Sequence, residues 1–375
     1  MNILHINSEL SWRGGEQQLA YLIQEMEALE KITLFVMGRS GSKLQAWCEE
    51  RGVHFVDAPL KGGVDFVTGF KIKQFCKLNK IDIIHAHTSH AHSAMLYAGL
   101  MGCKVSMVLH RRVSFPVKDR WLARVKYRSK MISAIICVSR DVKQVLEQTL
   151  PGDQRLVLIY DSINAARFKT VNYQSSFHER YKLPVSKFIV ANTSAISHEK
   201  DYMTFVDAAE VILSSDLDVV FLIVGEGPRR SCVEEYVKKK NLSKSIFFLG
   251  FVNDVSDVFQ HVSLLLMTSK KEGLGSAILE AFYHRVPVVA TSVGGIPEIV
   301  KHEETGMLAS AANFKEAARH VETVLAQPLL GSELAENGYR LVNELFLSSR
   351  MAEETLAVYK KVMAHERLET VNTVV

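Results

Sequence analysis

The sequence has 375 residues, of which 47% are hydrophobic and 23% are charged, and its formal net charge is +4. This length predicts two domains, and this composition excludes an intrinsically disordered chain. The five scattered cysteines form no CxxC pair, which argues against a disulfide framework and a cysteine zinc site and favours the reducing cytoplasm.

Targeting and membrane-spanning segments are not expected. No stretch approaches the 18 apolar residues that indicate a transmembrane helix. The N-terminus, MNILHINSEL, lacks the basic and apolar regions of a signal peptide and predicts a buried strand. We therefore expect a cytoplasmic protein, associated with the membrane at most peripherally.

Positive charge is concentrated in the first half of the chain. Residues 1–168 hold 23 Lys/Arg and 15 Asp/Glu, a net +8, whereas residues 169–375 hold 22 and 26, a net −4. A basic half indicates an anionic partner, such as a membrane surface or a phosphorylated acceptor. Nucleic acid is not expected, because no nucleic-acid motif is present.

Short apolar strands alternate with amphipathic helices in the first half, which predicts a parallel, doubly wound sheet. Helices are expected at 16–29, 66–79, 91–101 and 139–149. Strands are expected at 2–7, 32–37, 53–57, 81–86, 105–110, 133–138 and 155–160.

The alternation pauses at 161–186, which we interpret as a linker, and the tail 331–366 is expected to be helical throughout. The chain thus predicts an α/β protein with Rossmann-like domains at 1–165 and 166–347, and a C-terminal helix, 348–375, that packs back towards the first domain. Ligands are expected in a cleft at the carboxyl ends of the strands. Strands of the second half are expected at 187–194, 217–225, 245–250, 262–269 and 286–291.

The segment SKKEGLGSAILEAF (269–282) is the strongest chemical motif. Gly273 and Gly275 permit a tight turn, and Ser276 opens a helix whose free N–H groups suit a diphosphate. Glu272 and Glu280 flank this turn, and carboxylates accept hydrogen bonds from the hydroxyls of a sugar or a ribose. The motif therefore predicts a nucleotide-sugar site.

The longer segment EGLGSAILEAFYHRVPVVATSVGGIPEIV resembles the donor-site signature of glycosyltransferase family 4. The resemblance implies a retaining enzyme of the GT-B architecture, with two Rossmann-like domains. It also implies that Glu272 contacts the donor hexose and Glu280 the ribose. The diphosphate would bind the backbone of Gly273, Leu274, Gly275 and Ser276.

Three further segments extend the resemblance. SHEKDY (197–202) resembles the segment that carries a phosphate-binding lysine, here Lys200. The family usually has an arginine five residues earlier, where this chain has Ala195, and Arg229, Lys270 and Lys271 are candidates to replace it. LIVGEGPRR (222–230) resembles a Gly-x-Gly-Pro loop, and the nucleobase is expected near Val252.

The segment SWRGGEQQLA (11–20) follows the first strand and resembles the family's glycine loop. The resemblance places Gly15 on the donor side and Gly14 and Glu16 on the acceptor side of the site. Binding of NAD is not expected, because the sequence has no GxGxxG motif after this strand.

Four histidines fall within eight residues of IIHAHTSHAH (83–92). His85 and His87 alternate with apolar residues at a strand end, so they point to one face. They can be metal ligands, residues lining the cleft on the acceptor side, or packed side chains, and metal is the least favoured of the three. His110, which ends the next strand, matches a position where the family commonly has a histidine near the reacting sugar.

Residues 110–130 hold eight Lys/Arg and one acid, with Val117, Trp121, Leu122 and Val125 at helical spacing. A basic amphipathic helix of this kind either contacts an anionic membrane surface or docks by its apolar stripe.

We therefore expect a retaining glycosyltransferase that transfers a sugar from a nucleotide-diphosphate sugar, with UDP favoured, to a hydroxyl of a cell-envelope glycan or lipid-linked acceptor. His110 and Glu272 are the expected catalytic residues, and no cofactor or metal is expected. The alternatives are a nucleotide-sugar epimerase or hydrolase, a metal-dependent hydrolase and a catalytically silent GT-B binding module.

Overall fold

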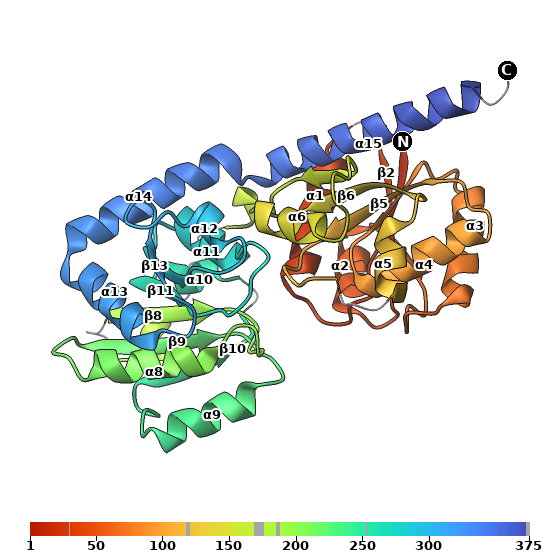
Figure 1. Ribbon diagram of the computed structural model, residues 1–375. Coiled ribbons are helices and arrows are strands. Elements are labelled where there is room, and N and C mark those ends of the chain that lie inside the picture. The colour runs from red at the N-terminus through yellow and green to blue at the C-terminus, as the bar shows by residue number, and fades with distance from the viewer. Residues whose placement is uncertain (30, 118–120, 169–175, 185–187, 253, 373–375) are drawn as a thin grey trace. The chain divides into compact units, whose positions relative to one another are not determined.

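The computed structural model describes residues 1–29, 31–117, 121–168, 176–184, 188–252 and 254–372 (Figure 1). Its internal contacts divide the chain into two compact units. The first unit contains Met1–Ser162 and the C-terminal segment from Ser348, and the second contains Ile163–Leu347. Each unit is a parallel sheet covered by helices.

The first unit is built on a seven-stranded sheet in the order β3-β2-β1-β4-β5-β6-β7. Its pairings are all parallel, so the carboxyl ends of its strands lie along one edge. The strands are β1 (Asn2–Ile6), β2 (Thr33–Gly38), β3 (His54–Asp57), β4 (Ile83–Ala86), β5 (Ser106–Arg111), β6 (Ile132–Cys137) and β7 (Leu156–Leu158). The helices are α1 (Gly14–Glu27), α2 (Lys43–Arg51), α3 (Phe66–Leu78), α4 (Ser89–Leu100), α5 (Trp121–Arg128), α6 (Arg140–Glu147) and α15 (Ser348–Asn372).

The second unit has a six-stranded parallel sheet in the order β10-β9-β8-β11-β12-β13. Its strands are β8 (Phe188–Thr193), β9 (Val219–Val224), β10 (Ile246–Gly250), β11 (Leu264–Met267), β12 (Val288–Thr291) and β13 (Met307–Ala309). Its helices are η1 (Ala165–Arg167), α7 (Phe177–Tyr181), α8 (Tyr202–Leu213), α9 (Arg230–Lys239), α10 (Ser256–Phe259), α11 (Ser276–Tyr283), α12 (Ile296–Ile299), α13 (Phe314–Ala326) and α14 (Pro328–Leu345).

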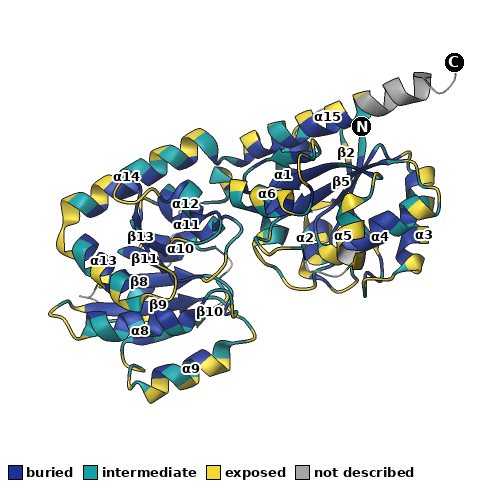
Figure 2. Ribbon diagram, viewed as in Figure 1, coloured by how far each residue is buried: buried dark blue, intermediate teal, exposed yellow. Residues whose placement is uncertain are grey.

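The central strands are largely apolar and buried because helices cover both faces of each sheet. Every residue of β4, β9 and β11 is buried. Figure 2 shows the strands in dark blue and the exposed residues on the outer sides of the helices. The predicted two-domain α/β architecture is confirmed, and each strand expected from the sequence is present, with its ends at most two residues from the predicted positions.

Helix α15 belongs to the core of the first unit although it follows the second unit in the chain. Met351, Val358 and Tyr359 are buried in the cluster that contains residues of α1 and β1. The hydroxyl of Ser348 also donates to Glu25 Oε1 of α1 at 2.5 Å. The first unit is therefore built from two segments that are separated in the chain by the second unit.

One prediction about helices was wrong, and a second was correct in part. The tail 331–366 is not one helix: α14 ends at Leu345, where Phe346 turns inward with 2% exposure and Leu347 pairs with Ile163. The helix expected within the basic segment 110–130 is present as α5, which begins at Trp121, so Val117 lies before it. The side chain of Leu122, which we expected in the apolar stripe, lies outside the described residues.

Candidate functional site

The loop that follows β11 carries the predicted donor motif, and two glycines shape it. Gly275 has φ of +104° and forms the N-cap of α11, a conformation that favours glycine. Gly294, after β12, has φ of +55°, and a Cβ there would lie 1.9 Å from the carbonyl oxygen of Glu272. The two loops therefore pack backbone against backbone, which fixes the position of Glu272.

Glu272, in this loop, forms an ion pair with Lys200, which lies 72 residues earlier in the loop after β8. The hydroxyl of Ser269 donates to the same carboxylate, at 2.8 Å from Oε1. The Glu272 side chain is 10% exposed and that of Lys200 21%. The structure thus brings together a predicted sugar-binding carboxylate and a predicted phosphate-binding lysine.

Glu280 lies on α11, one turn after Ser276 at the start of the helix, and its side chain is 15% exposed. Burial raises its pKa from 4.5 to about 7, and Arg167 opposes that rise. Arg167 Nη1 lies 3.5 Å from Glu280 Oε1, and it reaches the carboxylate from η1. Arg167 was not predicted from the sequence, because it lies in a polar segment without periodicity.

The loops after β8 and β9 are held close together by glycines. A Cβ at Gly225 or Gly227 would lie 2.2 Å from Ser194 O or 2.3 Å from Ile196 O. Ala195, which replaces the family's usual arginine, lies between those two carbonyls.

The candidate replacement cations lie on the neighbouring loops. Arg229 and Lys270 line a pocket of about 160 Å³ at the start of α8, and Lys270 pairs with Asp201 at 2.9 Å. Lys271 follows Lys270 in the loop after β11. Val252 is half-buried in the loop after β10, and its role at the nucleobase stays a prediction.

In the first unit, Gly14 and Gly15 form the first turn of α1. Glu16 closes that turn: its carboxylate accepts from the Arg13 backbone N–H at 3.0 Å and from Asn7 Nδ2 at 2.9 Å. Burial raises the pKa of Glu16 above 4.5. Both carboxylate oxygens are thus bonded within the loop, so in this structure Glu16 holds the glycine turn in place.

His85, His87 and His110 form a buried cluster with a fourth histidine, His5. The rings of His85 and His87 lie 4.1 Å apart, and those of His85 and His110 are stacked at 5.3 Å. His5 joins them because β1 lies beside β4 with His5 opposite His85. The other histidines of the 83–92 segment lie elsewhere: His90 is exposed, and His92 packs on Tyr127 at 5.0 Å.

Hydrogen bonds connect this cluster to three other residues. Arg112 lies 3.3 Å from His87 Nδ1 and 3.4 Å from His110 Nδ1, and its Nε donates to Asp161 at 3.2 Å. Tyr359 of α15 bonds His85 Nδ1 at 2.6 Å.

The cluster is electrically neutral apart from Arg112 and Asp161. Burial lowers the pKa of all four histidines, that of His5 from 6.5 to about 3, and Arg112 adds to each depression. Ring nitrogens of His5, His85 and His87 lie within 4.8 Å of one another, a spacing that would suit a metal ion. The guanidinium beside His87 opposes a second positive charge at this place.

His5, Arg112, Asp161 and Tyr359 were missed by sequence reasoning. The histidine in LHI, at the end of the first strand, was a usable signal, because strand ends of a parallel sheet share one edge. Arg112 follows His110 by two residues, so it could also have been placed at this edge of the sheet. Asp161 and Tyr359 had none, because each reaches the cluster through the path of a loop or of a distant helix.

Comparison with known proteins identifies the family. A model described as Glycosyltransferase Family 4 matches residues 12–167, and one described as Glycosyl transferases group 1 matches residues 174–341. The chain is 24% identical over 309 residues to N-acetyl-alpha-D-glucosaminyl L-malate synthase of Bacillus anthracis, covering 81% of each. It is also 24% identical over 317 residues to the UDP-Gal:alpha-D-GlcNAc-diphosphoundecaprenol alpha-1,3-galactosyltransferase of Escherichia coli, covering 79% of this chain and 80% of the relative.

A solved structure gives the same result for the fold. Anabaena Alr3699/HepE, in complex with UDP and glucose, superposes with a TM-score of 0.82 at 18% identity, over 96% of this chain and all of that chain. The fold is therefore that of a GT-B glycosyltransferase. With both halves matched by family models, the chain belongs to glycosyltransferase family 4, whose members are retaining enzymes. The predicted family, fold class and enzyme class are confirmed.

Proposed function

We propose that the protein transfers a sugar from a nucleoside-diphosphate sugar, with UDP as the favoured diphosphate, to a hydroxyl of a cell-envelope glycan or lipid-linked acceptor. The observation that carries this proposal is the arrangement around α11. Two largely buried carboxylates, Glu272 and Glu280, lie on either side of one glycine-capped helix N-terminus. Such an N-terminus binds a diphosphate, and the carboxylates accept bonds from sugar and ribose hydroxyls.

The residues then have distinct roles in a front-face substitution. The bond from the anomeric carbon to the diphosphate breaks, and the acceptor oxygen bonds to that carbon on the same face. The acceptor proton passes to the departing diphosphate, whose charge is stabilised by Lys200 and the α11 N-terminus. Glu272 positions the hexose, Glu280 the ribose, and His110 lies near the reacting sugar. We assign no step to a metal ion.

Two similar proteins support the donor and acceptor classes. The structure of Anabaena Alr3699/HepE holds UDP and glucose, and the E. coli relative is named for a UDP-Gal donor and a diphosphoundecaprenol acceptor. The net +8 of residues 1–168 is also favourable for an anionic acceptor or the membrane that carries it.

A nucleotide-binding screen tests the donor. We would measure the melting temperature with UDP, GDP, ADP, CMP and NAD, each with and without EDTA. Selective stabilisation by one nucleoside diphosphate, unchanged by EDTA, is expected. Lys200→Met should weaken that nucleotide about tenfold or more, the cost of one charge-assisted hydrogen bond, whereas the exposed Lys315→Met should not. Stabilisation by none, or only without EDTA, would contradict the proposal.

A transfer assay then separates the enzyme classes. The nucleotide identified in the screen is supplied as its labelled sugar, with and without an undecaprenyl diphosphate glycan. Label should enter the glycan only when acceptor is present, and the anomeric configuration should be retained. Consumption of the donor at the same rate without acceptor would instead indicate an epimerase or hydrolase.

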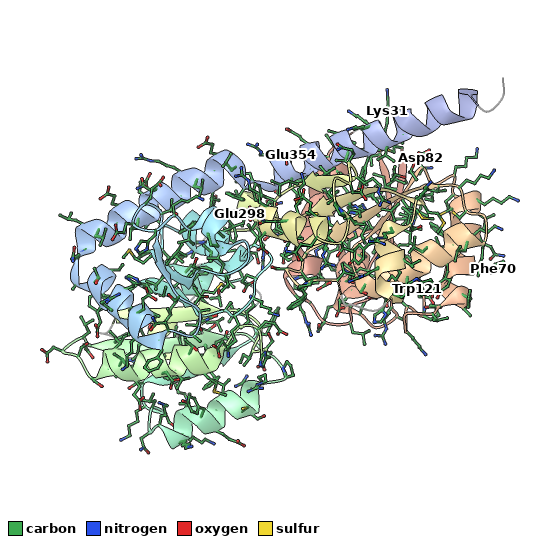
Figure 3. The ribbon with its side chains drawn as sticks, in the orientation of Figure 1. Lys31, Phe70, Asp82, Trp121, Glu298 and Glu354 are labelled. Carbon is green, nitrogen blue, oxygen red and sulfur yellow. The ribbon has the colours of Figure 1, made fainter. Side chains whose placement is uncertain are left out.

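We also propose that the first unit contacts an anionic membrane through α3 and α5, which both lie against α4. Phe66 packs on Tyr97 at 4.5 Å between ring centres, and Lys126 Nζ donates to Ser93 Oγ at 2.7 Å. Apolar side chains of these helices are exposed, among them Phe70 at 52% and Trp121 at 74% (Figure 3). Basic residues accompany them: Lys71, Lys73 and Lys77 on α3, and Arg124, Lys126 and Arg128 on α5.

In the described part of the chain, no helix combines the length and the apolar character that crossing a bilayer requires. Sedimentation with phosphatidylglycerol vesicles tests peripheral binding, since each basic residue near an anionic surface contributes about 1 kcal/mol. The variant Phe70→Ser with Trp121→Ser should bind less. The matched control, Leu329→Ser, changes a residue that is 88% exposed on α14 and should bind normally. Equal binding by both variants would contradict this surface.

A further inference from the structure

Arg112 lies at the centre of the histidine cluster and contacts residues from several elements. Its stem passes Gly15, where a Cβ would lie 3.8 Å from Arg112 Cδ. Its guanidinium donates to Asp161, which follows β7. It also faces His87, which directly follows β4, and His110 of β5. The side chains of Arg112 and Asp161 are each only 12% exposed, so this geometry is held within the protein.

The chemistry of a guanidinium leaves only one arrangement of protons on its neighbours. Arginine carries five N–H donors and no acceptor, and it stays charged at all ordinary pH values. A ring nitrogen that faces it must therefore present a lone pair. At both His87 and His110 that nitrogen is Nδ1. Each neutral ring then carries its proton on Nε2.

The constraint passes on to a third ring. His87 Nε2 lies 3.0 Å from His5 Nδ1, and since His87 Nε2 carries the proton, His5 must accept. His5 is thereby also protonated on Nε2. The fourth ring is set separately, because His85 Nδ1 bonds the hydroxyl of Tyr359. One arginine thus fixes three tautomers.

We propose that Arg112, anchored by Asp161, is a positioning residue that fixes the tautomers of His5, His87 and His110, so that His110 acts as a neutral N–H donor through Nε2. Within the described residues, Nε2 of His5, His85 and His110 is buried without a hydrogen-bond partner. Of these three rings, His110 is the one proposed to lie near the reacting sugar, where a ligand oxygen would accept its hydrogen bond. A ring in this state donates a hydrogen bond to an oxygen atom and does not serve as a general base. The inference rests on the proposed function for the place of His110 near the reacting sugar.

The groups that face the cluster come from several elements. His5 lies on β1, His85 and His87 at the end of β4, Asp161 after β7 and Tyr359 on α15. Asp161 pairs with Arg112, whereas His85 and His5 add to the lowering of the pKa of His110. Burial and Arg112 are the two largest causes that lower the pKa of His110 below 6.5. A proton added to Nδ1 would also point an N–H at the guanidinium. Burial is the largest cause that keeps the ring neutral, and Arg112 adds to it and selects the tautomer.

Nitrogen NMR of the histidine side chains tests the tautomers without any need for activity. In the ¹⁵N-histidine-labelled protein, His5, His87 and His110 should show protonated Nε2 and unprotonated Nδ1 from about pH 8 to about pH 5.5. In Arg112→Gln the ring stays buried, and the His110 signals should shift to a mixture of the two neutral tautomers. Arg112→Lys keeps the positive charge but lacks the forked guanidinium that reaches both rings, so it should give mixed tautomers for His87 or His110.

Kinetics provide the second measurement. Loss of Arg112 removes the second-largest cause that lowers the pKa of His110, so this pKa should move upward while burial still holds it below 6.5. The kcat of Arg112→Gln should therefore fall more steeply than that of the wild type between pH 7.5 and 5.5, with KM for the donor little changed. The control Arg51→Gln, at the exposed end of α2, should follow the wild-type profile.

The outcomes separate this inference from the proposed function. Protonated Nδ1 on His110 in the wild type would overturn the inference even if transfer occurs. Unchanged histidine signals in a folded Arg112→Gln, with activity lowered equally at every pH, would also overturn it, because Arg112 would then be only structural. Failure to transfer any sugar, with the expected tautomers present, would contradict the proposed function alone.

Discussion

Replacing Glu280 by glutamine should raise the stability of the second unit while weakening nucleotide binding. The Glu280 carboxylate is largely buried, and its pKa is raised from 4.5 to about 7, chiefly by burial. The folded protein therefore holds this proton more tightly than the unfolded chain does. It follows that the free energy of unfolding falls as the pH rises from 4.5 to about 7, and then levels off.

A pKa difference of this size corresponds to about 3 kcal/mol, at roughly 1.4 kcal/mol for each factor of ten in proton affinity. Glutamine has nearly the same shape and no charge, so Glu280→Gln should remove this penalty above pH 7 and change little below pH 5. The value is an upper one, because the substitution also removes the ion pair with Arg167 at 3.5 Å. A gain of about 1–3 kcal/mol at pH 8 is expected.

The assay must report on the second unit alone. The three tryptophans, Trp12, Trp47 and Trp121, all belong to the first unit, so their fluorescence does not report unfolding of the second unit. Hydrogen exchange of peptides from α11, followed in denaturant at pH 5 and pH 8, gives the unfolding free energy of the relevant region. Glu333→Gln, an exposed substitution on α14, is the matched control.

Nucleotide binding completes this test, because a ribose hydroxyl donates more strongly to a carboxylate than to an amide. The affinity of Glu280→Gln for the nucleotide should be about tenfold lower at pH 8. A variant whose stability follows that of the wild type at every pH would show that Glu280 is not a destabilised buried acid. Unchanged nucleotide affinity would remove Glu280 from the donor site.

Three other outcomes are expected. Gly294→Ala should lower nucleotide affinity at least tenfold and destabilise the second unit by about 1–3 kcal/mol, because its Cβ would lie 1.9 Å from Glu272 O. The control Gly331→Ala, where the nearest contact is an ordinary 3.5 Å, should be neutral or stabilising when both variants are followed by hydrogen exchange. Tyr359→Phe should destabilise the first unit by about 1–3 kcal/mol in tryptophan-monitored denaturation, because the buried Nδ1 of His85 loses its partner; a change below a few tenths would show that this bond contributes nothing. Glu272→Gln should lower kcat more than nucleoside-diphosphate affinity, since its predicted contact is with the hexose, and equal losses of both in steady-state and binding assays would contradict that role.

The strands and the donor motif could be predicted because their signals are local. A strand buried on both faces is a continuous apolar run, and β9 reads VVFLIV. Glu272, Gly275 and Glu280 belong to one strand–turn–helix segment, so their spacing alone places them around a helix N-terminus. The identity of the cations near Ala195 was left open, and no local rule chooses among them.

The contacts that were missed depend on how distant segments meet. Arg167 reaches Glu280 because the segment after β7 continues into the second unit as η1, and nothing in AAR indicates that path. His5 meets His85 because β1 lies between β2 and β4, an order that strand-forming residues do not encode. The break at Phe346 was hidden because residues on both sides of it favour helix.

The return of α15 to the first unit has a consequence for synthesis on the ribosome. The second unit, Ile163–Leu347, must be translated between the two parts of the first, which takes about 10–40 s at 5–20 residues per second. During that time the apolar surface that Val358 and Tyr359 later cover is open to water and to other nascent chains. The second unit, contiguous in the chain, is free to fold first. The histidine cluster acquires its bond from Tyr359 to His85 only after α15 has been made, so the first unit matures last although most of it is synthesised first.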